Sequence, residues 1–238
     1  MPSASQVEID ESPKVQADGP RIDLHSLVRE IRPSNISNLN SFHVRGKVLF
    51  TEGELARGVY ILRTGKATVS ISSSEGRLVI LRLAQAGDVL GLNSVMRNSA
   101  HDATVKTLAP CRTDFISRAE LIELMGKSEA GTNAVLKILS DELTVLTDRA
   151  RSLLLPQTAS ARLAKLLLEW SKENGLDRSR AVRIDKVFTQ EELAQMIGSS
   201  RETVTRLLAT LSRRQIIQIT TDSIFIRDRD ALETMTLR

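Results

Sequence analysis

Residues 198–211 decide the organisation of this chain, and they read GSSRETVTRLLATL. The stretch predicts a capped helix, with Ser199 as the expected N-cap and Glu202 as its capping-box partner. At about 100° per residue, the apolar side chains fall in one arc, which predicts a buried face. These apolar residues are Val204, Leu207, Leu208 and Leu211. Arg201, Glu202 and Arg206 fall in a different arc, which is expected to face solvent.

The polar arc carries side chains that can form hydrogen bonds with base edges in the major groove of DNA. Arginine pairs bidentately with guanine, and glutamate accepts a hydrogen bond from the cytosine amino group. Arg201, Glu202 and Arg206 are therefore candidate base-reading residues. The alternative is a surface helix whose charged face is only solvated, since such faces are common.

The residues just before this helix favour the DNA-reading alternative. Residues 189–198 read TQEELAQMIG and predict a second short helix, with Thr189 and Glu192 as a capping box and Gly198 at its end. Two short helices joined by a Gly-Ser-Ser turn are typical of a helix-turn-helix. The residues expected to pack between them are Phe188, Leu193 and Ile197.

Residues 200–206, SRETVTR, strongly resemble the recognition helix of the Crp/Fnr family of bacterial transcription regulators. The Arg-Glu-x-x-x-Arg pattern is similar to the catabolite-activator branch, and the resemblance runs from about Phe42 to the C-terminus. It implies that Arg201 and Arg206 read guanines, that Glu202 reads a paired cytosine, and that the half-site is TGTGA-like. Phosphate contacts are expected from Thr189, Gln190, Ser200 and Thr203.

Length and composition set the broad class. The 238 residues are enough for two domains, and no apolar run approaches the roughly 18 residues of a membrane span. The N-terminus lacks the layout of a signal peptide, so a cytoplasmic protein without a membrane partner is expected. The net charge of +4 is modest, whereas a nonspecific DNA-packaging protein would be more basic. No nucleophile elbow, phosphate-binding Walker loop or zinc-protease motif occurs, so no enzyme is expected.

Cys111 is the single cysteine, so neither an internal disulfide nor a cysteine-ligated zinc or iron–sulfur site can form. This excludes the iron–sulfur oxygen sensors of the family, which carry an N-terminal cysteine cluster. Cys111 lies among apolar residues and is interpreted as a buried small hydrophobe. A redox-sensing thiol is the alternative.

The N-terminal half predicts a β-roll. Residues 1–20 are expected to be a disordered arm, and residues 21–40 a short helical lead-in. Short alternating segments separated by glycines then predict a closed roll or jelly roll. The strand candidates are residues 48–50, 59–62, 67–71 and 78–83. Residues 53–62 and 87–91 are similar to the cyclic-nucleotide-binding fold.

That similarity implies a phosphate-binding cassette after Gly91, in which a glutamate binds the ribose and an Arg-Ser pair binds the phosphate. This chain has Leu92 at the position of the glutamate, and Asp102 and Ala103 at the positions of the Arg-Ser pair. A carboxylate repels phosphate, so classical cyclic AMP binding is not expected and no cofactor is predicted. The open alternatives are a roll that serves only packing and dimerisation, an unidentified effector, a cyclic-nucleotide-responsive regulatory subunit, and a redox or haem sensor that uses the roll, with His101 as the candidate haem residue.

Residues 131–155 predict a long helix with an unbroken 3-4-3-4-3 apolar seam. The seam residues are Leu136, Leu139, Leu143, Leu146, Ala150 and Leu153. Val135, Ile138 and Val145 form a second apolar face that can pack on the roll, which leaves the seam for a partner helix. The expected assembly is a homodimer with a parallel coiled coil.

The C-terminal part completes the predicted architecture. Pro156 is expected to break the long helix and to act as a hinge before a helix over residues 161–172, capped by Thr158 or Ser160. Residues 216–227 predict a hairpin wing, followed by a short final helix. The expected fold is α+β, with a roll at 21–130, a dimerisation helix at 131–155 and a winged helix-turn-helix at 156–238. Double-stranded DNA is the expected partner, and RNA polymerase a further one.

Overall fold

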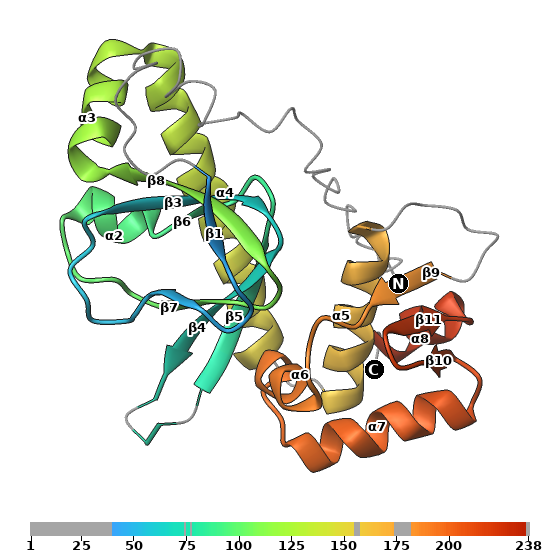
Figure 1. The fold of residues 1–238 in the computed structure, drawn as a ribbon. Helices are drawn as coiled ribbons and strands as arrows, with labels where there is room; N and C mark the ends of the chain where they lie inside the picture. Colours follow the sequence, from blue (N-terminus) through green and yellow to red (C-terminus); the bar gives the residue numbers. More distant parts are fainter. Residues whose placement is uncertain (1–39, 74, 77, 155–157, 174–181, 237–238) are drawn as a thin grey trace, which may run out of the picture.

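A computed structural model describes residues 40–73, 75–76, 78–154, 158–173 and 182–236, and the side chains of 152–154, 172 and 173 are not described. The predicted arm at 1–20, nearly all of the lead-in at 21–40 and the Pro156 hinge lie outside this part of the chain. Figure 1 shows a β-rich N-terminal body and a helical C-terminal body joined by one long helix.

The N-terminal body is a β-roll made of two antiparallel four-stranded sheets, with strand orders β1-β8-β3-β6 and β2-β7-β4-β5. The strands are β1 Ser41–His43, β2 Val48–Phe50, β3 Gly58–Thr64, β4 Lys66–Ser72, β5 Leu78–Gln85, β6 Val89–Leu90, β7 Thr104–Thr107 and β8 Cys111–Ser117. All four strand candidates of the sequence lie within observed strands. The expected roll is therefore confirmed, and alternating side chains from both sheets fill its interior.

Helix α2 Leu92–Arg97 lies between β6 and β7, and α3 Arg118–Lys127 and α4 Glu129–Leu154 follow the last strand of the roll. Ser117 and Glu120 form a capping box that starts α3. Helix α4 begins two residues earlier than residue 131, because the Ser128 hydroxyl accepts a hydrogen bond from the Gly131 N–H at 3.0 Å. Val135 is buried against the roll and Ile138 packs on the same cluster, as expected for the second apolar face. Val145, the third residue of that predicted face, is 44% exposed and lines a groove with residues of β5 and α5, so the prediction is wrong for it.

The C-terminal body is a winged helix. Its elements are α5 Ala159–Glu173, β9 Val182–Asp185, α6 Gln190–Ile197, α7 Arg201–Arg213, β10 Ile217–Ile219, β11 Ser223–Ile226 and α8 Arg229–Thr236. The Thr158 hydroxyl caps α5 by accepting the Ala161 N–H at 3.1 Å. The predicted hairpin is present, and β9 joins it in a sheet of order β10-β11-β9, a third strand that the sequence did not predict.

The two bodies are in contact through β5 and the loop between β1 and β2. Ile80 of β5 is 2% exposed and belongs to the same apolar cluster as Leu193 and Met196 of α6. Arg45 donates a hydrogen bond to the backbone oxygen of Val187, just before α6, at 2.9 Å. The start of the helix-turn-helix therefore packs directly on the roll.

Candidate DNA-binding surface

Helix α7 begins one residue later than its sequence predicts. The Ser200 hydroxyl, not that of Ser199, accepts the first N–H, from Thr203 at 3.2 Å. The Ser199 N–H instead donates to the Ala194 oxygen at 2.9 Å, so Ser199 belongs to the end of α6. Gly198 allows this ending because it adopts a left-handed conformation with φ of 59°. The predicted capping box of Ser199 with Glu202 is therefore wrong.

Glu202 points to solvent and is ionised. Hydrogen bonds from its own backbone N–H and from the Ser200 hydroxyl lower the pKa of this carboxyl group. A carboxylate can only accept hydrogen bonds, which is the role that recognition of a cytosine amino group requires.

The two faces of α7 separate as the periodicity predicts. Val204, Leu208 and Leu211 are buried in the C-terminal core, and Leu207 is half-buried. Arg201, Glu202 and Arg206 are all exposed. Within the described residues, no ion pair at 4.0 Å or less engages any of these three side chains. The two guanidinium groups are therefore available to a ligand, in line with the sequence prediction.

The residues proposed for phosphate contacts lie along the start of both helices. Thr189 caps α6 by accepting the Glu192 N–H at 3.1 Å, and Glu192 accepts the Thr189 N–H at 2.6 Å, so this predicted capping box is confirmed. Gln190 accepts a hydrogen bond from the Thr205 hydroxyl of α7 at 2.7 Å. The hydroxyl groups of Ser200 and Thr203 are 3.1 Å apart and hydrogen-bonded. The bond between Thr205 and Gln190 joins the surfaces of the two helices, and the other bonds order the first turn of each.

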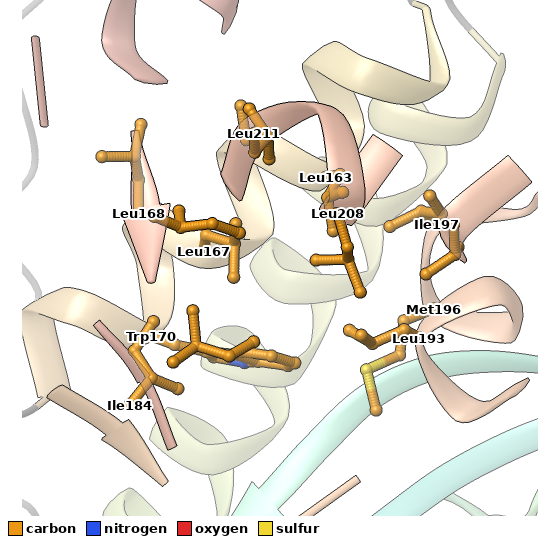
Figure 2. Packing of buried hydrophobic residues seen from close by; sticks show 14 of the residues in the cluster. Leu163, Leu167, Leu168, Trp170, Ile184, Leu193, Met196, Ile197, Leu208 and Leu211 are labelled. Carbon is orange, nitrogen blue, oxygen red and sulfur yellow. The ribbon is translucent and has the colours of Figure 1, made fainter. Parts of the chain in front are cut away.

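A well-packed core fixes the angle between the two helices. Phe188, Leu193 and Ile197 are each at most 4% exposed, as the sequence predicted. Figure 2 shows buried side chains of α5, α6 and α7, together with Ile184 of β9, gathered in one cluster. Arg162 of α5 donates to the Ile197 oxygen at 2.6 Å and so satisfies a carbonyl at the C-terminal end of α6. This core holds α6 and α7 in a fixed arrangement beneath their exposed faces.

The predicted seam of α4 is largely uncovered in the single chain. Leu136 is 57% exposed, Leu143 67% and Leu146 38%, and Ala150 is also exposed. Leu139 is half-buried against the roll, and the side chain of Leu153 is not described. Exposed large apolar residues aligned on one helix face are typical of an interaction surface.

A cavity of about 250 Å³ lies between the roll and α4. Gly91, Leu92, Asp102 and Ala103, the four residues predicted from the cassette, are all among its lining residues, so the structure brings them together. Leu139, Leu143 and Leu146 of the seam line the same cavity on the helix side.

The comparisons with known proteins agree with this geometry. The family model of the cyclic nucleotide-binding domain matches residues 42–128, and that of the Crp-like helix-turn-helix domain matches residues 161–235. The chain is 28% identical over 188 residues to a CRP-like cAMP-activated global transcriptional regulator of Mycobacterium tuberculosis, covering 79% of this chain and 84% of the relative. It is 26% identical over 212 residues to an anaerobic regulatory protein of Bacillus subtilis, covering 88% and 86%.

The chain belongs to the Crp/Fnr family of transcription regulators. Its fold is similar to the solved structure of FixK2 from Bradyrhizobium japonicum, with a TM-score of 0.74, 22% identity and coverage of 83% of this chain and 96% of that one. The structure of TTHB099 from Thermus thermophilus gives a TM-score of 0.70 at 22% identity, with coverage of 83% and 97%.

Asp102 in the cassette of this Crp/Fnr chain is held by side chains of α2. The Asp102 carboxylate accepts hydrogen bonds from Asn93 at 2.6 Å and from the Ser94 hydroxyl at 3.3 Å, and it pairs with Arg97 at 3.3 Å. Leu92 is fully buried and contributes to the roll core. The carboxylate that the sequence places in the cassette therefore has its own hydrogen-bond donors, which the sequence did not predict.

Two other candidate residues of this Crp/Fnr chain are buried. Cys111 is 1% exposed, as predicted, and burial raises the pKa of its thiol, which opposes formation of the reactive thiolate. His101 is 6% exposed and stacks on Phe50 with ring centroids 3.8 Å apart. No cluster of three or more potential metal-ligating side chains occurs in the described ranges.

None of the helices that the structure describes combines the length and the apolar character that a membrane crossing requires.

The sequence reasoning missed Arg45, which forms an ion pair with Glu192 at 3.6 Å and donates a hydrogen bond to the backbone oxygen of Val187. Arg45 thereby links the roll to the start of α6. An isolated arginine in a loop carries no local signal of such a role.

Proposed function

We propose that this chain acts as a homodimer that binds a palindromic DNA site with TGTGA-like half-sites and so regulates transcription. Arg201 and Arg206 each pair with a guanine, and Glu202 accepts from the amino group of the cytosine opposite one of them. The supporting observation is that these three side chains are exposed on α7, while the other face of the same helix is buried.

Contacts with DNA phosphates position the exposed face of α7 on the duplex. Thr189 and Ser200 are exposed at the first turns of α6 and α7, and Gln190 and Thr203 are half-exposed beside them. Hydroxyl and amide donors near helix N-termini suit phosphate oxygens, because the backbone dipoles favour negative charge there. Such contacts set the register of the protein and carry no sequence information.

The dimer forms through α4. The exposed leucines of the seam pack against the same leucines of a second chain, and the two recognition helices read half-sites about one DNA turn apart, roughly 34 Å. We divide the chain accordingly into a roll at 21–130, a dimerisation helix at 131–155 and a DNA-binding domain at 156–238. We further propose RNA polymerase as a partner of the DNA-bound dimer.

The roll serves as the effector domain. Its cavity lies directly against α4, so a bound molecule contacts the dimerisation helix. Such a molecule can shift the equilibrium between different arrangements of the two recognition helices in the dimer. The mycobacterial relative is named as activated by cAMP. In this chain Asp102 and Ala103 replace the expected phosphate-binding pair, which favours a different effector.

The test is a binding titration by fluorescence anisotropy with purified full-length protein. The probes are a labelled duplex with two TGTGA half-sites related by a palindrome, a single half-site and a scrambled duplex of equal length. Binding to the palindrome should be about 10³-fold or more tighter than to the scrambled duplex, as is typical of specific binding proteins. Equal affinity for the palindromic and scrambled duplexes would refute the proposal.

A further inference from the structure

The middle of the exposed face of α7 carries short side chains. At about 100° per residue, Arg201 and Arg206 lie at the two edges of this face, about 140° apart. Thr205 and Ala209 lie between them, together with Glu202, and both are exposed. Residues four apart on a helix lie one above the other on the same face, so Thr205 and Ala209 form a short line of small groups. This line allows the middle of α7 to approach base edges closely.

The hydroxyl group of Thr205 is already engaged within the protein. It lies 2.7 Å from the side-chain oxygen of Gln190 on α6 and 2.9 Å from the backbone oxygen of Arg201, and it donates to both. A hydroxyl group has one proton, so these two acceptors share it and none remains to be donated to a base. The oxygen is therefore held toward α6 and the helix backbone, and the methyl group is the part of Thr205 that is left for a ligand.

A methyl group between two arginines that read guanines suits a thymine. Thymine presents its C5-methyl group in the major groove, and threonine methyl groups pack against it. In the proposed TGTGA-like half-site, one thymine stands between the two guanines. Thr205 lies between Arg201 and Arg206 on the exposed face, so the order of these side chains matches the order of the bases.

We propose that Thr205 is a further specificity-determining residue, whose methyl group packs on the C5-methyl group of the thymine between the two guanines of each half-site. The inference rests on the proposed function and adds to it a base that is read through an apolar contact. Burying one methyl-sized group contributes about fourfold to affinity, so the two half-sites of a palindrome together contribute about 15-fold.

The test is a set of anisotropy titrations of the full-length protein with palindromes in which deoxyuridine replaces thymine at one position of both half-sites. This exchange removes only the C5-methyl group and keeps every hydrogen-bonding group of the base pair. Replacement of the thymine between the guanines should weaken binding about 15-fold, and replacement of the other thymines should change it little.

Thr205→Ser separates the methyl group from the hydroxyl group, because serine keeps the hydroxyl that bonds to Gln190 and lacks only the methyl. This variant should bind the unmodified palindrome about 15-fold more weakly than the unchanged protein does, and it should no longer distinguish thymine from uracil. Serine and threonine have similar helix propensities, so α7 should remain intact.

Thr210→Ser is the matched control. The Thr210 hydroxyl bonds to the backbone oxygen of Arg206 at 2.8 Å, in the same pattern as Thr205 with Arg201, but Thr210 lies outside the exposed arc, about 180° from Arg201. This variant should keep the preference for thymine.

Three outcomes would overturn the inference: uracil between the guanines binding as tightly as thymine, an equal loss at every thymine, or Thr205→Ser keeping the preference for thymine. Equal affinity of the unchanged protein for the palindromic and scrambled duplexes would instead overturn the proposed function, and the inference with it. The two failures are therefore distinguishable.

Discussion

Leu143 is the most exposed of the α4 seam leucines whose side chains the structure describes, and its truncation gives a quantitative test of the dimer. Burying a leucine fully contributes about 1.5–3 kcal/mol. Since Leu143 is 67% exposed in the single chain, covering it should contribute about 1–2 kcal/mol per copy and about 2–4 kcal/mol per dimer. Leu143→Ala should therefore raise the dimer dissociation constant by about 30- to 700-fold. Alanine favours helix, so α4 itself should remain intact.

Sedimentation equilibrium over a wide range of protein concentration measures this constant directly. Ile122→Ala is the matched control, because Ile122 is a 40% exposed apolar residue on α3, outside the seam. The control should dimerise as the unchanged protein does. The reasoning is refuted if Leu143→Ala leaves the dissociation constant unchanged, if both variants weaken it equally, or if the unchanged protein sediments as a single chain at micromolar concentration.

Three further predictions concern base reading, the turn before α7 and the half-buried carboxyl group of Glu142. Arg206→Ala should cost about 1–3 kcal/mol of binding to the palindrome and relax specificity at one base pair, as measured by competition with single-base variants. Gly198→Ala should destabilise the protein by about 1–2 kcal/mol in urea unfolding, because φ is 59° at this turn. Burial raises the pKa of Glu142, so the folded state holds this proton to higher pH than the unfolded state does. The free energy of unfolding therefore decreases as pH rises from the ordinary pKa of 4.5 through the raised pKa of the folded state. Glutamine does not titrate, so Glu142→Gln should not show this decrease.

Each of these predictions has a control or a contrary outcome. Arg183→Ala removes another exposed arginine, paired with Asp185 on β9, and should leave the base preferences unchanged. Arg206→Ala with unaltered preference at every position would contradict the assigned role. A Gly198→Ala protein as stable as the original would show that the turn adjusts without strain. Parallel stability curves for Glu142→Gln and the unchanged protein between pH 4.5 and 8 would contradict the pH prediction.

Much of the C-terminal domain could be predicted because its signals are local. The capping box of Thr189 and Glu192, the glycine at 198 and the apolar periodicity of residues 204–211 each lie within a few residues of the structure they specify. The seam of α4 is also local, since a helix brings residues three and four apart onto one face. These patterns were enough to place the exposed arginines correctly.

The remaining features depend on contacts between distant segments. Strand β9 has only four residues and is stabilised by pairing with β11, so its own sequence carries little signal. Ser199 and Ser200 are adjacent and chemically alike, and the hydrogen bond from Ser199 to Ala194 decides which of them caps α7. The bonds of Asp102 to the α2 side chains and the contact of Arg45 with α6 likewise form only once the chain has folded.

One consequence follows from the position of Leu139, Leu143 and Leu146, which belong to the seam and also line the cavity. A molecule in the cavity and a second chain on the seam would touch the same three side chains. Effector affinity would then depend on how much protein a cell contains, and the amount of protein needed to occupy its operators would depend on the effector. A change in expression level and a change in metabolite level would thereby become interchangeable signals to the same promoter.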